Sequence, residues 1–418
     1  MIILKPFKAI RPRKNLANYV AALPYDVMNS KEARKMVENN PYSFLHVDKA
    51  EIDLDENIDV YDKKVYEKAS SNLQNMIDSE VLLKDEKQYI YIYKLIMDGR
   101  EQTGIVVCTS IDDYINNKIK KHEHTREDKE LDRINHVDIC DANTGPIFLT
   151  YRHKDEISNI IKEWTKNDPV YDFAAIDNVR HMVWIIDDEH IINNICNEFK
   201  KVDELYIADG HHRAASAVKV GIKRRNANPN YTGDEEFNFF LSVLFPHSDL
   251  SIMDYNRIVK DLNGLSAEEF MLKVSEKFQI SIFEGEKPYK PSSKYTYGMY
   301  LQGKWYELTA IKGTYDLNNL VDKLDVSILQ NNLLGPILDI KDPRTDDRID
   351  FVGGIRGLKE LERRVEQENW GVAFSMYPTT IQELMDIADA GEVMPPKSTW
   401  FEPKLRSGLF IHSLKNCP

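Results

Sequence analysis

One stretch of the sequence decides how the chain is organised: LYIADGHHRAASA, residues 205–217. Its first apolar residues predict a strand that ends at Asp209, and the alanine-rich part predicts a helix that follows directly. Gly210 permits the tight backbone turn between the two, and Gly221 stands where a glycine cap would end the helix. The small residues on one face of this helix would let it lie close to a sheet.

The turn combines several groups that bind anions. Free N–H groups and the positive end of the helix dipole point at one place, and Arg213, His211 and His212 lie beside it. Such a place suits a phosphate, and Asp209 next to it could hold Mg²⁺ or accept a proton. The alternative is a turn whose polar residues only cap the helix and face solvent. We do not expect a zinc site, because neighbouring histidines point apart on a helix and no third ligand has a standard spacing.

Length and pattern predict a mixed protein with more than one part. The chain has 418 residues, of which 42% are hydrophobic and 29% charged, and this length exceeds what one core usually serves. Strand and helix signals alternate throughout, which predicts an α+β fold. We expect an N-terminal α+β region over residues 1–246, which contains the turn, and a C-terminal α+β region over 247–418.

Local signals place most of the elements. An Asp98-Gly99 pair between two apolar runs predicts a hairpin, and Ser266 with Glu269 predicts a capping box at a helix start. A second helix is expected from Ser30. Further strands are expected at 88–96, 104–108, 173–177, 181–186, 204–208, 237–245, 295–301, 305–310, 349–352, 371–376 and 409–412, and further helices within 317–333 and at 358–367.

Composition excludes several classes of protein. No run approaches the roughly 18 apolar residues of a membrane helix, and residues 1–6 lack the features of a secretory signal. A net charge of −13 argues against a large nucleic-acid footprint. Four distant cysteines suggest inert thiols in a reducing cytosol, so we expect a cytoplasmic protein with no membrane partner. These cysteines are Cys108, Cys140, Cys196 and Cys417.

Other nucleotide-binding motifs are missing from the sequence. There is no Walker-type G-x-x-x-x-G-K-[ST] run, and residues 352–357 (VGGIRG) lack the first glycine of a dinucleotide fingerprint. We therefore read 352–357 as a plain strand–helix turn.

Five segments give the chain a resemblance to domain-of-unknown-function family 1015, a prokaryotic family. The matching segments are ALPYDV (22–27), NPYSFL (40–45), HEHT (122–125), GPIF (145–148) and MPPKSTWFEPK (394–404). In addition, the Asp-Gly-His-His-Arg turn resembles the phosphate-binding turn of the ParB/sulfiredoxin-like fold, and more specifically that of free serine kinases. This resemblance implies a ParB/sulfiredoxin-like nucleotide-binding core with large insertions and a C-terminal α+β region.

The kinase resemblance also implies roles for the residues of the turn. Gly210, His211, His212 and Arg213 would hold the nucleotide phosphates, and Asp209 would support Mg²⁺ or catalysis. ATP or ADP with Mg²⁺ is then the expected cofactor, and the expected acceptor is a small hydroxylated molecule such as free L-serine or a similar amino acid. Phosphoryl transfer needs mainly positioning and charge stabilisation, so an anion cradle and one base could suffice.

Free serine kinases carry a glutamate base well before this turn, which cannot be aligned here. Glu123 is our candidate base and Glu32 the second choice. The alternative for Glu123 is a charge-dense solvated helix or loop over 118–133. The segment is not a thermolysin-type H-E-x-x-H site, because Arg126 stands where the second histidine should be.

The remaining candidate site residues lie elsewhere in the matching segments or close to them in sequence. Lys397, Ser398 and Thr399 lie between prolines and could grip a substrate carboxylate, or the prolines could only stiffen a surface loop. Further candidates are His122, Lys129, Arg133, Tyr25 and Asp26, and for the last two a Pro-rigid turn is the alternative.

We therefore expect a cytosolic small-molecule kinase. The alternative is a nucleotide-responsive switch or partner-binding protein of ParB-like type, which senses a nucleotide without transferring phosphate. Nucleic-acid binding is disfavoured by the acidic charge, and hydrophobic β-hairpins are compatible with a homodimer.

Overall fold

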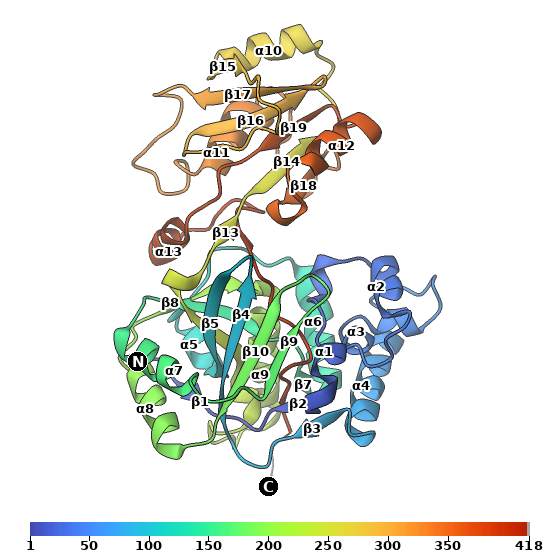
Figure 1. Ribbon diagram of the computed structural model, residues 1–418, viewed down its shortest axis with the longest axis vertical. Helices are drawn as coiled ribbons and strands as arrows, with labels where there is room; N and C mark the ends of the chain where they lie inside the picture. Colours follow the sequence, from blue (N-terminus) through green and yellow to red (C-terminus); the bar gives the residue numbers. More distant parts are fainter. Residues whose placement is uncertain (416–418) are drawn as a thin grey trace. The chain divides into compact units, whose positions relative to one another are not determined.

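The computed structural model describes residues 1–415 and divides the chain into two units (Figure 1). The first unit contains residues 1–250 together with the C-terminal segment from Pro403, and the second contains residues 251–402. The sequence placed the whole C-terminal part in the second region, and the structure corrects this for the C-terminal segment. The physical reason is that Leu409, Phe410 and Ile411 are buried in the first unit, where Ile411 exchanges backbone hydrogen bonds with Ile10.

A large mixed sheet forms the centre of the first unit. Its strand order is β6-β11-β8-β12-β5-β4-β10-β9, with β1 paired to β5. The β11–β6 and β12–β8 pairs are parallel and the other pairs are antiparallel. The elements of this unit are β1 (Leu4–Lys5), β2 (Ile10–Pro12), α1 (Ala17–Val20), α2 (Ser30–Val37), α3 (Leu45–Asp48), α4 (Lys63–Asp78), β3 (Leu82–Lys84), β4 (Ile90–Met97), β5 (Arg100–Ser110), α5 (Ile111–Ile115), β6 (Ile119–Lys120), α6 (Glu127–Cys140), β7 (Ala142–Asn143), β8 (Ile147–Tyr151), α7 (Asp155–Trp164), β9 (Tyr171–Ala174), β10 (Arg180–Ile186), α8 (Glu189–Phe199), β11 (Leu205–Asp209), α9 (His211–Ala227), β12 (Phe239–Pro246) and β21 (His412–Ser413).

Turn chemistry sets the predicted hairpin. Asp98 and Gly99 both have positive φ, 52° and 78°, as the two central residues of a two-residue hairpin turn require. Strands β4 and β5 therefore pair from Met97↔Arg100 inward, which confirms the prediction. Apolar residues of α7, α8 and α9 pack with the sheet in one core cluster, and α2, α3 and α4 contribute to a second cluster.

Helix α9 extends further than the sequence indicated. Gly221 was expected to cap its C-terminus, but the helix continues to Ala227. A Cβ at position 221 would lie 2.5 Å from the carbonyl oxygen of Phe237. The glycine therefore allows the helix to approach a neighbouring backbone closely.

The second unit is built on a six-stranded antiparallel sheet of order β15-β17-β16-β19-β14-β18. Ser266 and Glu269 form the predicted capping box. Gly354–Arg356 form a 3₁₀ turn between β18 and α12, in agreement with the expected strand–helix turn. The elements of the second unit are β13 (Ile252–Met253), β14 (Tyr255–Val259), α10 (Ala267–Ser275), β15 (Phe278–Ile282), β16 (Thr296–Leu301), β17 (Lys304–Ala310), α11 (Asp325–Leu329), a π-helical turn (Gln330–Leu334), β18 (Ile349–Gly353), α12 (Lys359–Gln367), β19 (Val372–Ser375), α13 (Ile381–Asp389) and β20 (Trp400–Phe401).

Within residues 1–415, no helix is long and apolar enough to cross a membrane. Cys108 and Cys140 are buried free thiols, and burial raises the pKa of both. Cys196 is a partly buried free thiol, and Cys417 lies outside the described residues.

A buried histidine helps to fix the C-terminal segment to the first unit. His181 Nδ1 lies 2.7 Å from the Tyr93 hydroxyl, and Arg406 Nε donates to His181 Nε2 at 3.3 Å. Arg406 also forms an ion pair with Asp177. Burial and the charge of Arg406 lower the pKa of His181 from 6.5 to about 3, so the folded protein holds this imidazole neutral.

We predict that His181 makes the folded state less stable in acid. Because its folded pKa lies below the unfolded value, the unfolded chain binds more protons below about pH 6.5, and stability falls as the pH decreases towards 3. A shift of this size corresponds to about 2 kcal/mol between pH 7 and pH 5. Denaturant unfolding at both pH values should show that His181→Gln loses most of this dependence. The exposed control His190→Gln should keep it, and a full pH dependence in His181→Gln would contradict the prediction.

Candidate functional site

The junction between β11 and α9 has the geometry expected of an anion-binding turn. Strand β11 lies between β6 and β8 and ends at Asp209. Gly210 takes the N-cap position with φ 94° and ψ 34°, a left-handed conformation that favours glycine. Helix α9 begins at His211, so the backbone N–H groups of its first turn lie next to the functional side chains.

Arg213 lies under this turn as a largely buried cation. One of its terminal nitrogens donates to the carbonyl oxygen of Pro146, and the other lies 3.1 Å from Asp209 Oδ2. Its Nε is buried and has no hydrogen-bond partner. Burial opposes the guanidinium charge, but Asp209 and Asp26 outweigh it and raise the pKa of Arg213. Arg213 therefore offers a permanent positive charge with an unsatisfied donor.

Asp209 faces two cations. In addition to Arg213, Lys404 Nζ lies 3.8 Å from Asp209 Oδ1, and Lys404 itself is 9% exposed. Both cations would compete with Mg²⁺ for this carboxylate, which weakens the expectation that Asp209 is a metal ligand. Lys404 is the last residue of the segment 394–404. Within this segment the sequence pattern predicted binding residues at 397–399 and did not indicate Lys404.

A cavity in the first unit brings Arg213 together with several other predicted residues. Arg133 forms a 2.8 Å ion pair with Asp132 and packs its guanidinium 4.0 Å from the centre of the Tyr25 ring. The cavity is lined by Pro24, Tyr25, Asp48, Arg133, His136, Val137, Asn143, Thr144, Gly145, Ile147, Arg213 and Ser407. The buried guanidinium group of Arg133 and the largely buried one of Arg213 therefore lie along one cavity, an arrangement that suits a phosphate or a carboxylate.

Sequence reasoning missed the polar residues that complete this cavity. Asp48 is buried and accepts a 2.9 Å hydrogen bond from Thr144 Oγ1. His136 Nε2 lies 3.1 Å from the carbonyl oxygen of Val47. The signal for Asp48 was its place three residues after NPYSFL (40–45), and Thr144 directly precedes GPIF (145–148).

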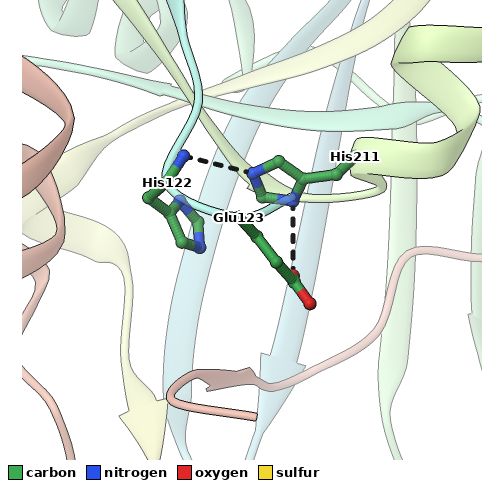
Figure 2. A group of neighbouring side chains, drawn as sticks. All are labelled: His122, Glu123 and His211. Atoms are coloured by element: carbon green, nitrogen blue, oxygen red, sulfur yellow. Dashed lines mark hydrogen bonds and ion pairs between the residues drawn. The ribbon is translucent and has the colours of Figure 1, made fainter. Parts of the chain in front are cut away.

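A second group of side chains meets around His211, whose side chain is not part of the cavity lining. Glu123 Oε2 lies 3.7 Å from His211 Nδ1, and the backbone N–H of His122 lies 3.5 Å from His211 Nε2 (Figure 2). The rings of His122 and His211 are perpendicular, with centroids 4.5 Å apart. One ligand atom from each of the three side chains lies within 4.8 Å of the others. We call these three residues the histidine–glutamate cluster.

Both imidazoles of this cluster are held neutral. Burial lowers the pKa of His122 from 6.5 to about 4, although Asp209 and the carbonyl of Ile207 act in the opposite direction. Burial, His122 and His212 together lower the pKa of His211 well below its usual value. Neither ring therefore supplies positive charge at neutral pH, so His211 can contact a phosphate only as a neutral group.

The other candidates from the sequence occupy separate environments. His212 Nε2 accepts a 3.0 Å hydrogen bond from the backbone N–H of Arg126. Glu32 forms a capping box with Asn29 at the start of α2, so its carboxylate serves the helix end. Helix α2 begins at Ser30, as predicted, and its N-cap is Asn29. Lys129 Nζ is hydrogen-bonded to the hydroxyl of Tyr61.

Lys397, Ser398 and Thr399 belong to the second unit. Ser398 is buried, and its hydroxyl donates to the carbonyl oxygen of Pro395 at 2.6 Å. Its own carbonyl accepts from Thr379 Oγ1. Lys397 is exposed and lies 5.7 Å from the centre of the Tyr255 ring. Ser398 therefore stabilises the loop, and substrate binding by these residues stays a prediction.

The sequence matches the family described as "Protein of unknown function (DUF1015)" over residues 4–327. The chain belongs to this family. No curated protein matched the sequence.

Several solved structures resemble this chain at low sequence identity. A conserved hypothetical protein from Pyrococcus furiosus is 15% identical, with a TM-score of 0.36 over 73% of this chain and 94% of its own. A free serine kinase in complex with AMP is 14% identical, with a TM-score of 0.36 over 73% and 92%. A C-terminally truncated SbnI from Staphylococcus aureus is 12% identical, with a TM-score of 0.38 over 74% and 89%.

We predict that Gly210→Ala not only strains the backbone but also displaces the guanidinium group of Arg213 and so weakens anion binding. A Cβ there would lie 3.1 Å from the guanidinium of Arg213, and the left-handed backbone costs about 1–2 kcal/mol for a non-glycine residue. Gly233→Ala is the matched control, because Gly233 has φ 98° and nothing within 4 Å of the added Cβ. Unfolding experiments should show similar losses of stability in both variants. Titration with pyrophosphate should show weaker binding only for Gly210→Ala, and equal binding in both variants would contradict the prediction.

Proposed function

We propose that this protein is a small-molecule kinase that transfers a nucleotide phosphate to a hydroxyl group, with free L-serine or a similar amino acid as the first acceptor to test. The observation that carries the proposal is the cavity of the first unit, along which the guanidinium groups of the buried Arg133 and the largely buried Arg213 both lie. A phosphate would satisfy the unpaired Nε of Arg213.

The turn supplies the rest of the proposed phosphate site. Gly210 lets a phosphate approach the backbone closely, and the first-turn N–H groups of α9 complement its negative charge. The resemblance of the Asp-Gly-His-His-Arg turn to that of free serine kinases supports this assignment. With it we propose a ParB/sulfiredoxin-like core in the first unit, and ATP or ADP with Mg²⁺ as the donor.

The proposed base is Glu123, with Asp48 as a competitor. Glu123 lies next to His211, and His211 is two positions before Arg213 in the chain. However, Glu123 is not among the residues that line the cavity. Asp48 does line the cavity, where it accepts a hydrogen bond from the hydroxyl of Thr144. A base must reach the proton that it removes. The acceptor hydroxyl would therefore have to bind in a different place for Asp48 than for Glu123.

The position of Glu123 also favours the second candidate function. A nucleotide-responsive switch needs the phosphate cavity but no base, and the glutamate that the kinase scheme requires lies outside the cavity lining. Nucleotide binding without a phosphorylated product would support the switch.

We predict that Arg213→Ala weakens nucleotide binding by about tenfold to a hundredfold, the usual range for loss of a charge-assisted hydrogen bond. Calorimetric titration with ATP, ADP, CTP and GTP in the presence of Mg²⁺ measures this and identifies the donor. Arg180→Ala is the control, since Arg180 pairs with Asp172 at the surface. Absence of binding to all four nucleotides would refute both the kinase and the switch.

We predict that Glu123→Gln retains nucleotide binding and lowers turnover by about a hundredfold or more, as expected when a general base is removed. Formation of phosphorylated product from L-serine, followed by mass spectrometry, is the measurement. The exposed Glu127→Gln on α6 should behave as wild type. Full turnover in Glu123→Gln with loss in Asp48→Asn would transfer the role of base to Asp48.

A further inference from the structure

His122 is buried in a way that hydrogen bonding does not explain. The residue is 2% exposed, and neither ring nitrogen has a hydrogen-bond partner of good geometry, although the carbonyl oxygen of Ile207 lies near enough to raise its pKa. A buried polar group without a partner costs about 1–3 kcal/mol, so such groups call for an explanation. A ligand that accepts a nitrogen lone pair would provide one.

The neighbours of His122 are the groups that such a ligand would need. His211 comes from the start of α9 and Glu123 from the segment between β6 and α6, and their ligand atoms lie with that of His122 inside a span of 4.8 Å (Figure 2). His211 is 5% exposed, whereas the Glu123 side chain is 40% exposed. Two buried imidazoles and one carboxylate with access to solvent therefore meet at one point.

We propose that His122, Glu123 and His211 bind a divalent first-row transition-metal ion, with Zn²⁺ as the ion to test first. Two imidazoles and one carboxylate are a ligand set of catalytic zinc sites, which leave a fourth position open for water or substrate. Two nitrogen donors disfavour Mg²⁺, which prefers oxygen ligands. The exposed side of Glu123 gives the open position contact with solvent.

Metal binding requires a small rearrangement of the cluster. Bonds of about 2.1 Å in tetrahedral geometry place ligand atoms about 3.4 Å apart, so the side chains must move together by about 1 Å. Binding through His211 Nδ1 also requires the tautomer that carries its proton on Nε2. That change gives up the contact with the His122 N–H, which at 3.5 Å is at the limit of a hydrogen bond. Both imidazoles are already neutral, as metal ligands must be.

This site shares Glu123 with the proposed kinase scheme, but it lies apart from the phosphate cavity and could bind an ion without kinase activity. His211 and Arg213 are two residues apart on α9, so they point to different sides of the helix, one to the cluster and the other to the cavity. With an ion bound, Glu123 is a ligand, and a hydroxyl or water in the open position loses its proton more readily. In a kinase this would replace the action of Glu123 as the general base.

The test is metal binding by the full chain without an affinity tag, after removal of metals with a chelator. We expect calorimetry to find one Zn²⁺ per chain, and Co²⁺ to give visible absorption typical of a four-coordinate site. His122→Ala and Glu123→Gln should each weaken binding by more than about tenfold. His124→Ala is the control, because His124 is an exposed histidine of the same segment, and it should bind as wild type.

Two results would overturn the proposal: no binding of Zn²⁺ or Co²⁺ by the wild-type chain, or equal binding by wild type and His122→Ala. Thermal unfolding of each variant, compared with wild type, shows whether a loss of binding comes from loss of the fold. If His122→Ala does not fold, Glu123→Gln decides the question, since Glu123 is partly exposed. Calorimetry with ATP and Mg²⁺ in the presence of wild-type and Arg213→Ala chains separately tests the phosphate cavity, so failure of one site is distinguishable from failure of the other.

Discussion

The left-handed backbone of Gly210 determines where each side chain at the start of α9 points. It turns the chain from β11 directly into the helix, so that His211 begins the first turn. Because successive helix residues are about 100° apart, His211 and Arg213 face different sides. Arg213 reaches the carbonyl oxygen of Pro146 and the cavity, and His211 reaches Glu123. One short turn therefore serves two distinct groups of residues.

Close packing behind α9 maintains this arrangement. Ala214, Ala217 and Val218 belong to the same buried cluster as the central strands of the sheet, and Gly221 gives the helix its close approach to the backbone at Phe237. Larger side chains there would move the helix away from the sheet, and Arg213 and His211 would move with it. The same small residues that stabilise the core thus position the polar residues at the helix start.

The C-terminal segment contributes to the first unit in two ways. Arg406 holds it to Asp177 and His181, while Lys404 and Ser407 lie beside Asp209 and the cavity respectively. A chain segment that follows the second unit in sequence therefore supplies Ser407 to the cavity of the first unit and Lys404 to its Asp209. This arrangement accounts for Asp209 lying between two cations.

The sequence by itself determined the features that depend on near neighbours. The Asp98-Gly99 hairpin, the capping box of Ser266 and the strand–Gly210–helix junction follow from local backbone preferences, and the structure contains all three. Only the tertiary structure decided which distant residues meet. His122 and His211 are 89 residues apart in sequence, and the sequence argument against a metal site considered only ligands at short spacing. Asp48 reaches the cavity and Gly221 lies inside α9 because of packing between elements that are distant in sequence. The local sequence pattern contains no information about this packing.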